Sequence, residues 1–130
     1  MSTRSPPAIA RAWWQAVDHA HFDAAVGQIA PDAVIDWPLS NERMANPRMW
    51  QQVNEHYPGR WAASMRSVVA DGESVVTVSD ISDVSIAVVA ISFFTVQISQ
   101  ITNLVKYWPE RYAQPEGRSQ WTVPITTSLS

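Results

Sequence analysis

The chain has 130 residues, of which 46% are apolar and 16% are charged, and its formal net charge is -3. This length suits one domain around one hydrophobic core and leaves no room for a separate catalytic domain. The slight negative charge and the scattered basic residues argue against a nucleic-acid partner, which requires a basic surface. Because the chain has no cysteine, disulfides, thiol nucleophiles and cysteine-ligated zinc are excluded. The three histidines have no metal-ligand spacing beyond one i, i+2 pair, so we expect neither a metal nor a cofactor.

The two ends of the chain differ in composition from its middle. Residues 1–7 are polar and lack the charged-then-apolar order of a secretory signal, so we expect a disordered N-terminus and a cytoplasmic protein. The longest apolar stretch, residues 86–96, is about half the length needed to cross ~30 Å of hydrocarbon, so we expect no membrane partner. Residues 124–130 are expected to be disordered. One domain is therefore predicted over residues 8–123.

Three helices and one short strand are predicted in the first half of the chain. Apolar residues recur there at three- and four-residue steps, then alternate, and then return to helical spacing. Proline and glycine mark the ends of these segments. The predicted elements are two helices within residues 7–29 that break near 19–21, a strand at 33–37, an exposed loop at 40–46 and a helix at 47–57.

Four β-rich segments, at 65–70, 74–79, 86–96 and 101–108, fill the second half. The sequence Asp71-Gly72 predicts a hairpin between the first two segments. Helices first and strands second favour an α+β fold, with the helices packed on one face of a strongly bent antiparallel sheet. The turn Gln97–Gln100 lacks a residue that readily takes positive φ, so the register of the last strand stays open by one residue.

Five short sequence motifs occur in a characteristic order along the chain. They are Ala12-Trp13-Trp14-Gln15, Phe22-Asp23, Asp36-Trp37-Pro38, Tyr57-Pro58-Gly59 and Tyr107-Trp108-Pro109-Glu110. In this order they resemble the SnoaL-like polyketide cyclases of the nuclear transport factor 2-like superfamily, over roughly residues 8–123. The resemblance implies a cone-shaped α+β barrel, in which a curved sheet and three N-terminal helices enclose a deep pocket, and a homodimer formed through the outer face of the sheet.

The same superfamily includes ketosteroid isomerases, and their catalytic groups are missing here. The resemblance places the isomerase tyrosine at Trp13, the general-base aspartate at Trp37 and the protonated aspartate of the oxyanion hole at Ser92. Neither Trp37 nor Ser92 can supply a carboxylate, which both proton abstraction and oxyanion stabilisation in that mechanism require. Steroid isomerisation is therefore disfavoured.

Lys106, Asp36 and His56 are the candidate catalytic residues. Strand alternation places Lys106 on the same face as Leu104 and Trp108. If that face is concave, the amine can serve as a base, a Schiff-base nucleophile or an anchor for a carboxylate or enolate. A bulge that reverses the alternation, or a stem that reaches solvent, is the alternative. Asp36 alternates away from Trp37, which leaves a surface role open, and His56 is either a proton-transfer group or a solvated helix end.

Large aromatic side chains dominate the candidate substrate-binding residues, and they suit a ring-bearing ligand because indole offers a flat apolar face and one N–H donor. Ordinary core packing is the alternative. The candidate residues are Trp13, Trp37, Tyr57, Ser92, Phe94, Leu104 and Trp108.

Two functions follow from this pattern. The first is a cofactor-free cyclase, isomerase or hydratase that acts by acid–base chemistry on a small, apolar, ring-containing molecule. The second is a non-catalytic ligand-binding or dimeric scaffold domain that has lost its catalytic groups. A fold by itself does not choose between them, and the apolar character of both faces of residues 86–91 suits a dimer in either case.

Overall fold

The computed structural model describes residues 4–57 and 59–125. Its helices are α1 (Pro6–Asp18), α2 (Phe22–Val26) and α3 (Pro47–Glu55), with short 3-10 turns η1 (Pro38–Ser40) and η2 (Ser119–Trp121). Its strands are β1 (Ile29–Trp37), β2 (Glu42–Met44), β3 (Ala62–Asp71), β4 (Ser74–Ser82), β5 (Ala87–Gln97) and β6 (Gln100–Tyr107).

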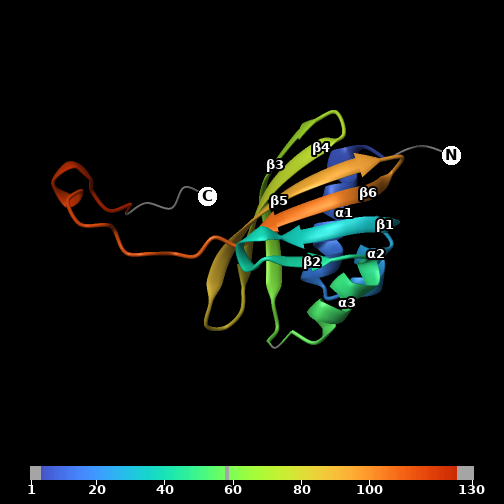
Figure 1. The fold of residues 1–130 in the computed structure, drawn as a ribbon, viewed down its shortest axis with the longest axis horizontal. Helices are drawn as coiled ribbons and strands as arrows, with labels where there is room; N and C mark the ends of the chain where they lie inside the picture. Colours follow the sequence, from blue (N-terminus) through green and yellow to red (C-terminus); the bar gives the residue numbers. More distant parts are fainter. Residues whose placement is uncertain (1–3, 58, 126–130) are drawn as a thin grey trace.

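The six strands form one curved, unclosed sheet in the order β2-β1-β6-β5-β4-β3, and the three helices gather on its concave face (Figure 1). β1 and β6 run parallel, and every other neighbouring pair is antiparallel. α1 packs against β3, β4, β5 and β6, and α3 packs against β1 and α2. The predicted α+β class, with helices on one face of a bent sheet, is confirmed.

α1 begins where its sequence supplies a cap. Ser5 Oγ accepts a hydrogen bond of 3.3 Å from the Ala8 N–H, and Pro6 and Pro7 occupy the first turn, where a missing N–H costs nothing. The helix therefore starts two residues before the domain boundary expected at residue 8. The rest of the expected disordered N-terminus, residues 1–3, lies outside the described residues, as does 126–130 of the expected disordered tail.

The chain between α2 and α3 is more extended than predicted. α2 ends at Val26, and β1 begins at Ile29, because Ile29 pairs with Ile101 of β6. The pairing is irregular between Ile29 and Val34, and this irregularity accommodates Pro31, which has no N–H to donate. β2 forms inside the predicted loop.

The turn between β5 and β6 has a backbone conformation that is unfavourable for its residues. Ile98 and Ser99 adopt φ values of 50° and 60°, in the left-handed region, and Gln97 pairs with Gln100 across them. The pairing then shifts by one residue, since Thr95 faces Asn103 whereas Val96 faces Ile101. After this bulge Leu104 and Lys106 both lie buried on the concave face, so the bulge does not move Lys106 to the outer face.

The two faces of the sheet differ. The concave face carries the buried core, including Ile35, Val75, Phe94 and Leu104. The opposite, outer face carries apolar side chains that are only half-buried or exposed. Beyond Trp108 the chain leaves the body as an extended tail (Figure 1). None of the helices in the described ranges has the length and apolar content needed to cross a bilayer.

Candidate functional site

A row of three polar side chains crosses the concave face on adjacent strands. Thr77 of β4 is the Cα partner of Ser92 of β5, and Ser92 is the Cα partner of Lys106 of β6. Thr77 and Ser92 are fully buried, and Lys106 is 3% exposed. Each of these residues occupies an inward position of its strand, so the alternation of the strands brings the three together.

Lys106 is the one lysine of the sequence, and it ends among tryptophan rings. Its Nζ lies 4.1 Å from the ring centroid of Trp13, 4.6 Å from that of Trp14 and 5.2 Å from that of Trp108. Trp13 and Trp14 come from α1 and Trp108 follows β6. We call the concave-face region formed by Lys106, Ser92 and these three indoles the lysine chamber.

Burial holds the pKa of Lys106 well below its usual range. Two effects oppose each other here. Removing an ammonium ion from water costs several kcal/mol, whereas a cation above an aromatic ring gains about 0.5–2 kcal/mol. No carboxylate in the described ranges forms an ion pair with Lys106, and no acceptor there hydrogen-bonds to it. Desolvation therefore dominates, and it shifts the equilibrium of the amine towards its neutral form relative to a lysine in water.

The surroundings of the chamber hold polar atoms without partners. Trp14 satisfies its Nε1–H by donating to Thr77 Oγ1 at 3.0 Å. Five other buried polar atoms have no hydrogen-bond partner among the described residues, and three of them are indole N–H groups, which can only donate. The five atoms are Trp13 Nε1, Trp37 Nε1, Trp50 Nε1, Ser79 Oγ and Ser92 Oγ. Donors outnumber acceptors among these five atoms, which favours a partner that brings acceptor oxygens.

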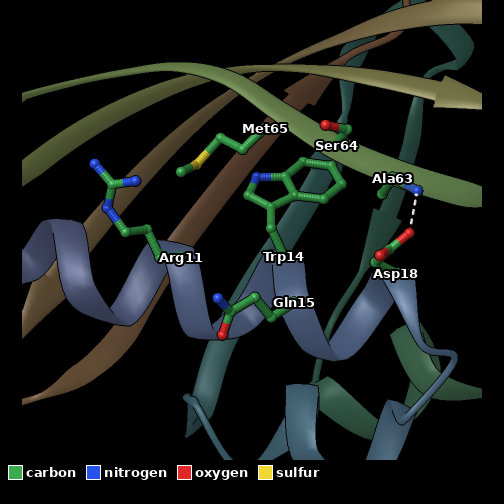
Figure 2. Close-up of a pocket in the computed structure, with 7 residues that line it drawn as sticks. All are labelled: Arg11, Trp14, Gln15, Asp18, Ala63, Ser64 and Met65. Atoms are coloured by element: carbon green, nitrogen blue, oxygen red, sulfur yellow. Dashed lines mark hydrogen bonds between the residues drawn. The ribbon is translucent and has the colours of Figure 1, made fainter.

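Trp14 separates the chamber from a surface hollow. The hollow has a volume of about 240 Å³ and lies between α1 and β3. Figure 2 shows the Trp14 indole rising from α1 towards Met65 and Ser64, with Gln15 next to it on the helix and Arg11 one turn before it. The Ala63 N–H donates to Asp18 Oδ1 at 2.7 Å and ties the end of α1 to β3 (Figure 2). Lys106 Nζ lies 4.6 Å from the centroid of the same indole ring, so Trp14 borders both the hollow and the lysine chamber.

Asp36 and His56 do not join Lys106. Asp36 lies on the outer face, where Arg43 donates to both of its carboxylate oxygens at 2.7 and 2.9 Å. These hydrogen bonds hold the pKa of Asp36 below its usual value. His56 is exposed at the end of α3, with its Nδ1 2.8 Å from the Gln52 carbonyl oxygen. Of the three candidate catalytic residues, the structure therefore places only Lys106 on the concave face.

The candidate binding residues divide in the same way. Trp13, Ser92, Phe94 and Leu104 are buried on the concave face. Trp37 and Trp108 are half-buried, and their ring centroids lie 6.0 Å apart. Tyr57 is 54% exposed and packs edge-on against Trp61 instead.

Sequence reasoning missed Trp14, Trp50, Thr77 and Ser79. Trp50 packs on Trp13 with a centroid distance of 5.4 Å. Thr77 and Ser79 share the inward alternation of Val75 and Ile81 on β4. Hydroxyl-bearing residues at inward positions of an otherwise apolar strand face are a signal in the sequence, and this signal could have located Thr77 and Ser79.

The comparisons with known proteins agree with this architecture. No known family profile matches the sequence, and no curated protein matches it. Among solved structures, a proposed ketosteroid isomerase from Kribbella flavida has a TM-score of 0.90 at 23% identity, over 98% of this chain and 94% of that one. A protein of unknown function from Burkholderia xenovorans, described as NTF-2 like, has a TM-score of 0.78 at 26% identity, over 92% and 94%. This chain has the nuclear transport factor 2-like fold.

The structure of a proposed SnoaL-like polyketide cyclase from Shewanella denitrificans is also similar, with a TM-score of 0.70 at 11% identity over 80% of this chain and 90% of that one. The resemblance drawn from the five sequence pieces is thus confirmed at the level of the fold. No cluster of three or more potential metal-ligating side chains occurs within residues 4–57 and 59–125.

Proposed function

We propose that the lysine chamber binds a small ring-bearing molecule through an acceptor oxygen. The single observation that carries this proposal is the buried amine of Lys106, which lies among three indole rings without an acceptor or a counter-charge in the described residues. Buried polar groups in native proteins normally have partners. A carbonyl, enolate or carboxylate oxygen of a ligand supplies the partner that the protein lacks.

The indoles give this ligand its second feature. Flat rings stack well on aromatic faces, and the faces of Trp13, Trp14 and Trp108 surround the amine. A molecule with an apolar ring and an oxygen at one edge therefore fits better than a pure hydrocarbon or a compact anion. The nuclear transport factor 2-like neighbours, which include a SnoaL-like polyketide cyclase, support a small-molecule-binding role of this kind.

We further propose that Lys106 is the acid–base group of a cofactor-free cyclase, isomerase or hydratase reaction. Burial favours the neutral amine, which can accept a proton from a carbon next to a carbonyl. Ser92 is the Cα partner of Lys106 across the strand pair, which supports the proposal that its hydroxyl donates to the oxygen on which charge develops. Steroid isomerisation by paired aspartates stays disfavoured because Trp37 and Ser92 occupy the corresponding positions.

A second candidate is a packed, non-catalytic module. Its support is the close packing of the indoles on one another, with centroid distances of 4.7 Å for Trp13 and Trp14 and 5.4 Å for Trp13 and Trp50. A ligand enters only if these rings move. In both candidates we propose a homodimer that pairs the outer sheet faces, because apolar side chains line a hollow there.

Tryptophan fluorescence tests the proposal directly, since the chain has seven tryptophans. Ring ketones and ring carboxylates are titrated in parallel with the matching hydrocarbons. We expect saturable quenching by the oxygen-bearing ligands and a loss of affinity of at least about tenfold in Lys106→Met, the equivalent of one hydrogen bond. Asp36→Asn, on the outer face, serves as the control and leaves affinity unchanged.

Equal binding of the hydrocarbons, or unchanged affinity in Lys106→Met, contradicts the proposed role of the amine. An absence of response to every ligand favours the packed module. Turnover of a bound ligand that stops in Lys106→Met but survives in Asp36→Asn supports the enzymatic role.

A further inference from the structure

The tail after Trp108 carries large apolar side chains that its own body leaves uncovered. Residues 109–125 run away from the sheet and the helices (Figure 1). Within the part of the chain that the structure describes, their hydrogen bonds join tail residues only. Exposed fractions of the large apolar tail residues are 84% for Tyr112, 78% for Trp121, 86% for Val123 and 84% for Ile125.

The tail nevertheless has local structure. Gln114 Nε2 donates to Thr122 Oγ1 at 2.8 Å, and the Trp121 N–H donates to the Arg118 carbonyl at 2.9 Å, so a small loop closes on itself. Pro109, Pro115 and Pro124 restrict the backbone further. A preorganised segment loses less entropy when it docks. The loop keeps the Trp121 side chain exposed in a defined conformation, as in a contact surface and unlike a random coil.

For two of the similar structures, the aligned region extends past the body into the tail. Residues up to Trp108 are 108 of 130, so a match confined to the body cannot reach the 98% coverage of the Kribbella flavida structure or the 92% of the Burkholderia xenovorans structure. The Shewanella denitrificans structure covers 80% of this chain, which the body alone accounts for. Alignments that reach into the tail at 23% and 26% identity favour a tail whose course is fixed by contacts, and within the described residues the tail's own body does not supply these contacts.

The outer sheet face offers a surface of matching chemistry. A hollow of about 470 Å³ lies there, lined by Ile91, Phe93, Val105 and Tyr107. Phe93 is 44% exposed, although it is a large apolar residue in the middle of the sheet. Tyr107 ends β6 two residues before the tail begins, so the tail starts at the border of the hollow. The apolar patch and the apolar segment are therefore continuous along the chain.

We propose that residues 109–125 form an exchanged arm, which packs its apolar side chains on the outer sheet face of a second copy of this chain. This inference rests on the proposed pairing of outer faces. A twofold axis makes the exchange reciprocal, since each copy gives one arm and receives one. The arm can extend over roughly 50 Å, which exceeds the radius of gyration of about 14 Å for a domain of this size. The arm can therefore cross the interface.

The first experiment measures the monomer–dimer equilibrium of the full chain by analytical ultracentrifugation. The triple variant Trp121→Ser, Val123→Ser, Ile125→Ser is expected to raise the dimer dissociation constant by at least about tenfold, because it removes apolar area from the contact. The control Leu39→Ser, Val84→Ser removes side chains that are 64% and 105% exposed on the body. We expect the control to have no effect. Equal dissociation constants in all three proteins, or a monomer at every concentration, overturn the proposal.

The second experiment identifies the copy that receives the arm. Because the chain has no cysteine, Asn103→Cys introduces a single thiol on the exposed outer face, two residues before Val105, and a photo-crosslinker is attached there. This copy is ¹⁵N-labelled and mixed with an unlabelled copy without the cysteine. We expect crosslinks from labelled residue 103 to unlabelled peptides of 109–125. Crosslinks confined to labelled tail peptides show that the arm folds on its own body and overturn the proposal. The ligand affinity of the lysine chamber is measured in the same samples, so that a failure of the exchanged-arm hypothesis can be distinguished from a failure of the ligand-binding hypothesis.

Discussion

Ser92 and Lys106 are Cα partners on adjacent antiparallel strands, and both side chains are buried on the concave face. Directly opposed residues of an antiparallel pair have Cβ atoms about 4.5–5.5 Å apart. Ser92 Oγ lacks a hydrogen-bond partner in the described residues, and Lys106 lacks an acceptor. The protein thus keeps one hydroxyl and one amine side by side in its interior, neither of which contributes fully to its stability.

The free energy of unfolding should rise when the amine is removed. Lys106→Met is expected to stabilise the protein by about 1–4 kcal/mol near neutral pH, as when buried charged groups give way to apolar ones. The folded-state pKa of Lys106 lies below its unfolded value of 10.5, so the unfolded chain binds more protons between the two values. The penalty for burying Lys106 is full below the folded pKa and disappears as pH rises past the unfolded pKa. Urea unfolding from pH 6 to pH 10.5 should show the advantage of the variant shrinking, and an advantage independent of pH would contradict this account.

Trp14 should control chemical access to Lys106. Because Lys106 is the one lysine, an amine-acylating reagent has one ε-amine to modify, and mass spectrometry separates it from the α-amino group. Trp14→Ala removes the wall between the chamber and the surface hollow, so the labelling rate of Lys106 is expected to rise by at least about tenfold. Trp121→Ala removes an exposed indole from the tail and should not change the rate. Equal rates in Trp14→Ala and the unmodified chain would argue for a different route.

Arg43 should set the pKa of Asp36. The Arg43 hydrogen bonds favour the carboxylate, so Arg43→Ala is expected to raise the pKa of Asp36 towards its usual value of about 3.9. A carboxyl group with a lowered folded pKa adds stability above its unfolded pKa, and that contribution is lost as pH falls through the folded pKa. An NMR titration of the Asp36 carboxyl carbon measures the shift. The pair is exposed to solvent, and ligand affinity in the lysine chamber should stay the same.

Ile98 should be replaceable with a gain in stability. It is 90% exposed and holds a φ of 50°, a conformation that β-branched residues resist. Ile98→Gly is expected to stabilise the protein by about 1 kcal/mol, because glycine adopts positive φ without strain. The matched control Val84→Gly, at an equally exposed turn position without positive φ, should be neutral or destabilising. Thermal unfolding distinguishes the two, and destabilisation by Ile98→Gly would contradict the account.

Local patterns predicted the order of the helices, the later strands and the shared face of Leu104, Lys106 and Trp108, but they left open whether that face is concave. The register of the last strand was uncertain by one residue, and a slip of one residue would have moved Lys106 to the other face; the pairing shifts between Thr95 and Val96, and Lys106 is buried on the concave face. The parallel pairing of Ile29 with Ile101 was not predictable in this way, because it joins residues far apart in the sequence. The same holds for β2, whose short polar sequence becomes a strand only beside β1. Asp36 shows the limit for sites, because its partner Arg43 is identified by cross-strand register and by no local motif.

The parallel pair of β1 and β6 has a consequence for how the molecule folds. β6 lies between β1 and β5, so the last strand of the body must insert between the first strand and the fifth. Contacts between distant parts of a chain form late, since their loop-closure entropy is lost before they contribute stability. Lys106 is carried by that inserted strand. The lysine chamber therefore cannot form in part while the chain is being synthesised on the ribosome. Lys106 contacts Trp13, Trp14 and Trp108 only when nearly the whole body has folded.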